Sequence, residues 1–201
     1  PRAPISAKMV ADFISVAGAE RVVTIDMHAG QIQGYFDCPV DNLFAVPVML
    51  DALRKLGEEK MVIVSPDAGG VERARAYAKR LNAPLAIVDK RRDKPNQAQA
   101  MHVIGDVEDR VAIMVDDMID TAGTLCAGAE VLLKNGARRI VACATHPVLS
   151  GPAIDRINST EALSQVFVTD TIPLGDKLER CPKLKVISVA AILGKTIHNI
   201  H

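Results

Sequence analysis

Short runs of apolar residues recur along the chain, and stretches with helical spacing separate them. The runs cover residues 22–25, 61–64, 85–88, 111–115, 140–144, 166–168 and 186–189. Continuous apolar strands that alternate with helices are typical of parallel sheets covered on both faces. We therefore expect an α/β protein with a mainly parallel sheet and helices on both faces.

Three of the intervening stretches carry apolar residues at the spacing of an amphipathic helix. The first covers residues 5–17 and is followed by Gly18, a residue type that commonly ends helices. The second covers residues 71–81, and the third covers 125–133 before Asn135 and Gly136. These stretches predict the helices that cover the sheet.

The length of 201 residues fits one or two domains at roughly 150 residues each. A boundary is expected near Ala45-Val46-Pro47, where one unit of strand and loop ends and a new series of helices and strands begins. We expect residues 1–44 to be the C-terminal part of one domain and residues 45–201 to form a second domain.

The composition excludes several classes of function. The 24 basic residues balance the 24 acidic ones, and aromatic residues make up only 3% of the chain. Bulk electrostatic binding to nucleic acid or to a membrane surface is therefore not expected. No apolar run approaches the roughly 18 residues of a spanning helix. We expect a cytoplasmic protein with neither nucleic acid nor membrane as a partner.

The four cysteines show no CxxC motif and no Cys/His metal spacing. Cys143 lies in an apolar run that is predicted to be a buried strand. We interpret the cysteines as reduced thiols that pack mainly as small apolar side chains.

Polar residues follow three of the predicted strands, in segments 26–30, 65–70 and 116–124. Ligands of open α/β sheets bind outside the carboxyl ends of the strands. Each segment joins acidic residues to small ones. These three segments are therefore the first candidates for a functional site.

The third segment reads Asp116-Asp117-Met118-Ile119-Asp120-Thr121-Ala122-Gly123-Thr124. Small residues at a helix start let backbone N–H groups approach an anion, and the helix N-terminus favours negative charge. The adjacent carboxylates would repel a polyphosphate, but they can accept hydrogen bonds from sugar hydroxyls. The segment predicts a site for a sugar phosphate. The alternative is a turn that ends in a helix cap at Asp120.

Residues 111–124 resemble the phosphoribosyl-pyrophosphate signature that type I phosphoribosyltransferases share with phosphoribosyl-pyrophosphate synthetases. Segments 26–43 and 64–75 are similar to the synthetases and not to the transferases. The similarity runs from residues 4–8 through 144–147 and 169–173. The chain is identified as a member of the phosphoribosyl-pyrophosphate synthetase family, and a type I phosphoribosyltransferase-like fold is expected.

The resemblance implies that the β,γ-diphosphoryl group of ATP moves to the anomeric hydroxyl of ribose 5-phosphate, which leaves AMP. It implies that the 5-phosphate binds to the loop residues Asp120, Thr121, Ala122, Gly123 and Thr124. Asp116 and Asp117 would bind the ribose hydroxyls, with Asp67 near the ribose.

The resemblance also implies Mg²⁺ bound by His28 and Asp67, although a histidine after a strand is often only a loop hydrogen-bond donor and Mg²⁺ prefers oxygen. It implies that Lys90 and Arg92 are catalytic cations on a loop that closes over the phosphates. Without the resemblance, this basic cluster would be interpreted as a solvated turn.

The partners implied are ATP, ribose 5-phosphate, a regulatory phosphate or ADP, and further copies of the chain, a hexamer in the family. The family also implies a missing N-terminal part of roughly 100 residues, the size of a domain, and a missing short C-terminal tail. We therefore expect the fragment to be weakly active or inactive. The alternatives are a non-catalytic, synthetase-associated regulatory subunit and a type I phosphoribosyltransferase.

Overall fold

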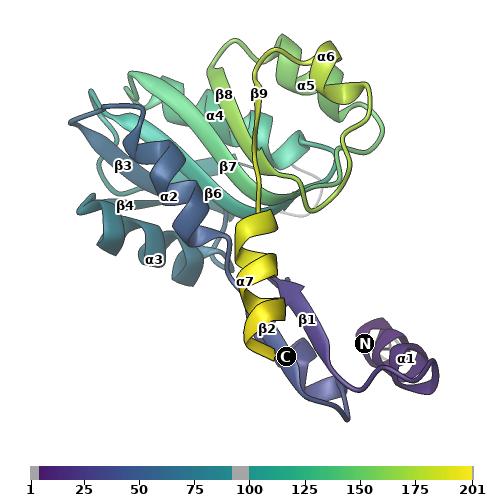
Figure 1. The fold of residues 1–201 in the computed structure, drawn as a ribbon. Helices are drawn as coiled ribbons and strands as arrows, with labels where there is room; N and C mark the ends of the chain where they lie inside the picture. The colour runs from purple at the N-terminus through teal and green to yellow at the C-terminus, as the bar shows by residue number, and fades with distance from the viewer. Residues whose placement is uncertain (1–4, 92–99, 201) are drawn as a thin grey trace. The chain divides into compact units, whose positions relative to one another are not determined.

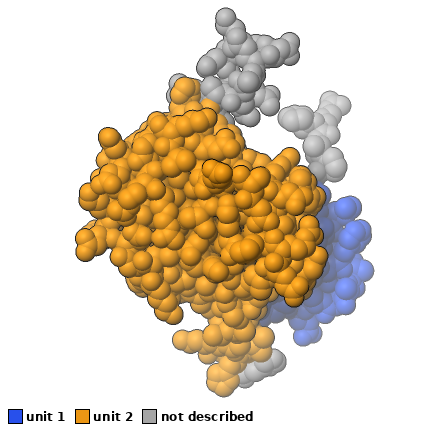
Figure 2. All heavy atoms as spheres, turned by 90° about the horizontal axis from the view of Figure 1, so that it is seen from above, with its two compact units in different colours: residues 1–45 blue, residues 46–201 orange. Residues whose placement is uncertain are grey.

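The computed structural model describes residues 5–91 and 100–200, with only the backbone described at Lys90, Arg91 and Ala100. The chain divides into two compact units, residues 1–45 and residues 46–201, which Figure 2 distinguishes by colour. In the described residues, none of the helices has the length and apolar character needed to cross a membrane.

The first unit contains α1 (Ser6–Val16), β1 (Val22–Ile25), a 3-10 helix η1 (Gly30–Tyr35) and β2 (Val40–Leu43). The strands β1 and β2 pair in parallel from Val22–Val40 to Ile25–Leu43. The sequence predicts α1 and β1 but not β2, because two polar residues interrupt its short apolar pattern.

The predicted apolar face of α1 is not a buried face in this chain. Ile5, Met9 and Phe13 are each more than half exposed, and the buried residue of this helix is Ala11. The periodicity therefore predicts the helix correctly but not the burial of its apolar face.

The second unit is built on a seven-stranded sheet with the order β5-β4-β3-β6-β7-β8-β9 (Figure 1). Its strands are β3 (Met61–Ser65), β4 (Leu85–Arg91), β5 (Ala100–Ile104), β6 (Val111–Ile119), β7 (Arg139–Pro147), β8 (Leu163–Thr169) and β9 (Leu184–Ile187). All neighbouring pairs are parallel except β4 with β5, which is antiparallel. This confirms the mainly parallel sheet.

Helices cover both faces of this sheet, as predicted. The helices α2 (Val46–Arg54) and α3 (Val71–Leu81) pack on one face against a buried cluster that includes Ile63 and Ile113. The helices α4 (Gly123–Lys134) and α5 (Ala153–Ser159) pack on the other face with Val62 and Met114. Neighbouring strand residues thus enter opposite core clusters because side chains alternate along a strand. The remaining helices are α6 (Lys177–Arg180) and α7 (Ala190–Ile200).

The strand β6 extends further than the sequence predicts, since it includes the acidic pair. Its pairing with β7 continues to Ile119–Pro147, whereas its pairing with β3 ends at Val64–Met114. Asp116 and Asp117 therefore lie within β6 and beyond the last pair with β3, not after the end of their own strand. The predicted strand at 186–189 is also corrected, because β9 ends at Ile187.

The strand order reverses between β3 and β6. From β3 the chain proceeds through β4 to β5 at one edge, and from β6 it proceeds through β7 and β8 to β9 at the other edge. The helices that follow β3 and β6 consequently lie on opposite faces. Such a reversal leaves a crevice at the carboxyl ends of the two strands, where ligands of open α/β sheets bind.

We expect Gly105→Ala to lower the free energy of unfolding by about 1–3 kcal/mol. Gly105 follows β5 with φ +110°, and an added Cβ would lie 3.0 Å from both Cα and Cβ of Ala86. Urea unfolding measures the change. The matched control is Gly194→Ala within α7, where an added Cβ would meet no described atom within 4 Å apart from the nearby helix backbone, and alanine should stabilise the helix by up to about 1 kcal/mol. Equal effects of the two substitutions would contradict this account.

Candidate functional site

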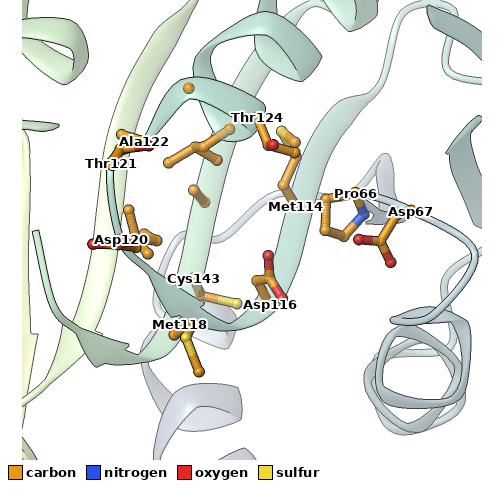
Figure 3. A pocket seen from close by; sticks show the side chains of 14 residues that line it. Pro66, Asp67, Met114, Asp116, Met118, Asp120, Thr121, Ala122, Thr124 and Cys143 are labelled. Atoms are coloured by element: carbon orange, nitrogen blue, oxygen red, sulfur yellow. The ribbon is translucent and has the colours of Figure 1, made fainter. Parts of the chain in front are cut away.

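A pocket of about 200 Å³ lies at the reversal between β3 and β6. It is lined by residues that follow β3, by residues of β6 and β7, and by the whole segment 118–125. Figure 3 shows Asp116 between Asp67 on one side and the loop of Asp120 and Ala122 on the other. The pocket thus has a carboxylate side and a loop side.

The structure brings most of the predicted substrate-binding residues to this pocket. They are Asp67, Asp116, Asp120, Thr121, Ala122, Gly123 and Thr124. Asp117 is different, because only 3% of the residue is exposed and it is not part of the pocket lining. Adjacent side chains of a strand point to opposite faces, so the two acidic residues occupy different environments.

The loop side of the pocket turns sharply before α4. Ala122 adopts a left-handed conformation with φ 59°, and the 12-residue helix α4 begins at Gly123. An L-residue in this conformation costs about 1–2 kcal/mol relative to the right-handed helix region. Small residues therefore suit this turn, and they keep the backbone accessible to an anion.

The carboxylate side is organised by Arg73, a residue of α3. Its Nη1 lies 3.4 Å from Oδ1 of Asp117 and 3.8 Å from Oδ1 of Asp116. The backbone N–H of Asp117 donates to Oδ1 of Asp116 at 2.9 Å. Burial, with a further contribution from the Asp117 carboxyl group, raises the pKa of Asp116 to about 7, although Arg73 opposes the shift.

Cys143, a residue of β7, contributes a thiol to the pocket lining. Burial is the main reason why the pKa of this thiol is raised, and the nearby Asp116 carboxylate adds to the effect. The interpretation of Cys143 as a buried strand residue is confirmed.

Asp67 is held by a tight turn after β3. Its Oδ1 accepts the N–H of Gly70 at 2.9 Å, and Ser65 Oγ donates to its carbonyl oxygen at 2.6 Å. A Cβ at Gly70 would lie 2.9 Å from that Ser65 hydroxyl oxygen, so the close turn requires glycine. The turn leaves Asp67 exposed at the pocket.

Besides Asp117, three further predicted residues are not among the residues that line this pocket. His28 follows β1 in the first unit and is exposed, so its pairing with Asp67 at a metal stays a prediction. The backbone of Lys90 lies in β4, where it pairs with Met101, and Arg92 lies outside the described residues. Across 5–91 and 100–200, no group of three or more histidine, cysteine or acidic residues could hold a metal ion.

The sequence analysis did not assign to the site three residues that contact it. Arg73 could have been found, because it follows the second polar segment in the first turn of a predicted helix. Ser150 and Arg156 carry no comparable signal. Ser150 Oγ donates to the carboxylate of Asp120, and Arg156 Nη1 donates to the carbonyl oxygen of Thr121 at 2.9 Å.

The raised pKa of Asp116 predicts a pH-dependent effect of Asp116→Asn on stability. Between pH 3.8 and about 7 the folded carboxyl group keeps a proton that the unfolded chain releases, so this residue lowers stability as the pH rises. The free energy of unfolding of Asp116→Asn minus that of the parent should therefore be larger at pH 8 than at pH 5. Urea unfolding at both pH values measures this, with Glu72→Gln on the exposed side of α3 as the control. An identical change at both pH values would contradict the assignment.

The chain matches the phosphoribosyl synthetase-associated domain family over residues 89–201. Its curated relatives include the ribose-phosphate pyrophosphokinase of Burkholderia pseudomallei, which is 54% identical over 199 residues. The enzyme of the same name from Xylella fastidiosa (strain 9a5c) is 55% identical over 201 residues. Both alignments cover 99% of this chain and 62% of the relative. The chain therefore spans less than two thirds of the length of these relatives.

The fold is also similar to a solved structure, the phosphoribosylpyrophosphate synthetase from Mycobacterium smegmatis. The TM-score is 0.91 at 41% sequence identity, and the match covers 100% of this chain and 65% of that one. This similarity confirms the resemblance predicted from the motifs. Since the family match also extends over more than half of its residues, the chain belongs to the phosphoribosyl synthetase-associated domain family.

Proposed function

We propose that the complete protein transfers the β,γ-diphosphoryl group of ATP to the anomeric hydroxyl of ribose 5-phosphate. A bond forms between the anomeric oxygen and the β-phosphorus, the bond from the β-phosphorus to the α-phosphate oxygen breaks, and AMP leaves. The hydroxyl proton is released. The observation that carries this proposal is the pocket with a carboxylate side and a small-residue loop on opposite sides.

The loop side suits the 5-phosphate of the sugar. Thr121 and Thr124 contribute hydroxyl groups, and the turn at Ala122 lies directly before the helix α4. Positive helix N-termini and approachable backbone N–H groups bind phosphate monoesters. This side is therefore assigned to the phosphate.

The carboxylate side suits the ribose hydroxyls. Asp116 lines the pocket and can accept hydrogen bonds from a diol, whereas Asp117 is buried beside Arg73. We therefore assign the direct contact to Asp116. Asp117 would keep Arg73 close to Asp116, and the guanidinium would limit the repulsion between the two carboxyl groups.

Mg²⁺ fits the donors of this pocket. Asp67 and Asp116 both line it, and Mg²⁺ in such sites binds one or two carboxylates together with substrate phosphates. When bound, the ion would neutralise charge on the transferring phosphates. His28 as a further ligand and Lys90 and Arg92 as catalytic cations belong to the same proposal.

The remaining parts of the proposal concern more than these 201 residues. The relatives are longer than this chain, so ATP binding is assigned to the complete protein. Regulation by phosphate or ADP, a homo-oligomeric assembly and a cytoplasmic location are proposed on the same basis.

The direct test is to incubate the complete protein with ATP, ribose 5-phosphate and Mg²⁺ and to measure AMP. Formation of equal amounts of AMP and phosphoribosyl pyrophosphate would support the proposal. A folded protein that forms neither product, or that releases pyrophosphate from phosphoribosyl pyrophosphate only with a nucleobase, would contradict it.

Thr124→Ala should weaken the binding of ribose 5-phosphate about 3- to 10-fold, the effect of one lost hydrogen bond to a substrate. ATP affinity should remain unchanged, because the hydroxyl belongs to the loop side of the pocket. Isothermal titration calorimetry measures both affinities. Thr196→Ala in α7, where the hydroxyl bonds only a helix carbonyl in the described contacts, is the control.

Lys90→Ala should lower kcat at least about 100-fold, as expected for a lost cation that stabilises charge in the transition state. The affinity for ribose 5-phosphate should change little. Steady-state kinetics and calorimetry separate the two effects, and Lys79→Ala on the exposed side of α3 is the control. A large loss of sugar-phosphate affinity with unchanged kcat would show that Lys90 has a different role.

A further inference from the structure

Three consecutive carbonyl groups, at the last residue of β6 and the first two residues of the loop before α4, accept hydrogen bonds from one segment, residues 149–156. The contacts are Leu149 N–H to Ile119 at 2.9 Å, Ser150 N–H to Asp120 at 3.0 Å and Arg156 Nη1 to Thr121 at 2.9 Å. The Ser150 hydroxyl adds a bond to the Asp120 carboxylate. We call residues 149–156 the buttress of the loop.

These contacts determine the direction of the backbone N–H groups. In a planar trans peptide the N–H points opposite to the carbonyl group of the preceding residue. Because the carbonyl groups of residues 119, 120 and 121 face the buttress, the N–H groups of Asp120, Thr121 and Ala122 point away from it. The same three residues line the pocket. The buttress thus directs a row of donors away from itself, as an anion site requires.

Arg156 makes the contact closest to the strained turn. It donates to Thr121, directly before the left-handed Ala122, and a Cβ added at Gly123 would lie 3.4 Å from its Nη1. The guanidinium group therefore lies beside the turn and also binds the carbonyl oxygen of Thr121. Removal of the Arg156 side chain would remove the hydrogen bond to the Thr121 carbonyl oxygen, next to the residue whose backbone is strained.

The helix that carries Arg156 is itself held firmly. Ala153, Ile154 and Ile157 of α5 are buried in the core cluster on the α4 face of the sheet. At the end of α5, the N–H and the hydroxyl of Thr160 both donate to the Arg156 carbonyl oxygen, at 3.0 and 2.7 Å. The backbone of Arg156 is therefore held in place, and this fixes the position from which its side chain reaches the loop.

We propose that Arg156 is a positioning residue that holds the loop 120–124 in the conformation that binds the phosphate of the sugar. This inference rests on the proposed function. Arg156 acts on the affinity for ribose 5-phosphate and not on the diphosphoryl transfer, because its contact is with the loop.

The test uses calorimetric titration of the complete protein with ribose 5-phosphate and, separately, with ATP. Arg156→Ala should bind ribose 5-phosphate about 10-fold more weakly, which corresponds to about 1.4 kcal/mol, and should bind ATP as the parent does. The affinity of Arg156→Lys for ribose 5-phosphate should lie between those of the parent and Arg156→Ala. Lysine keeps a hydrogen-bond donor and the positive charge, but it lacks the planar guanidinium group. Arg80→Ala is the matched control, since Arg80 is exposed and donates to a carbonyl group within α3.

Kinetics provide a second measurement that general destabilisation would not reproduce. The KM for ribose 5-phosphate should rise about 10-fold in Arg156→Ala while kcat at saturation stays within about twofold of the parent. If Arg156→Ala does not fold, Ser150→Ala removes only the hydroxyl contact and should raise the same KM about threefold.

Unchanged affinity for ribose 5-phosphate in both Arg156→Ala and Ser150→Ala would overturn the role of Arg156 and leave the proposed function in place. An equal loss of ribose 5-phosphate binding and ATP binding in these variants would do the same. A parent protein that binds no ribose 5-phosphate would overturn both. The two failures are therefore distinguishable in one set of titrations.

Discussion

The pairing of β6 with β7 beyond the end of β3 is the constraint on which the rest of the site depends. It carries β6 to Ile119, whereas the pairs with β3 end at Met114. The extension places Asp116 at a strand edge that β3 does not cover. It also delivers the chain to the loop before α4 at the same end of the sheet. The extended strand thus carries Asp116 on the carboxylate side and leads directly into the loop side, while Asp67 comes from the turn after β3.

This arrangement places two acidic groups together at a partly buried position, which is unfavourable for their charged forms. The structure compensates with Arg73, a cation from the helix on the opposite face of the sheet from α4. The left-handed backbone conformation of Ala122 also costs free energy, and the hydrogen bonds from the buttress help to offset this cost. Local costs supported by surrounding contacts are typical of functional sites, where proteins depart from locally favourable choices.

Much of this fold could be predicted because it depends on local patterns. Apolar runs indicated the central strands, and residue types alone indicated the acidic pair and the small-residue loop as candidates. The antiparallel β5 was missed because it is a short edge strand with a polar residue in it. The access of Asp116 to the pocket depends on where β3 stops, and the contact of Arg156 with Thr121 joins residues 35 apart in sequence. Such features follow from tertiary packing, which a local pattern does not contain.

The burial of Cys143 has a consequence for the chemical durability of the pocket. Oxidants and alkylating agents react with the thiolate form of cysteine, and a thiol with a raised pKa stays protonated near neutral pH. Cys143 therefore lies at the pocket as a buried residue whose thiol is chemically inert. Cys38 is only partly buried, so an oxidant would reach its thiol before that of Cys143.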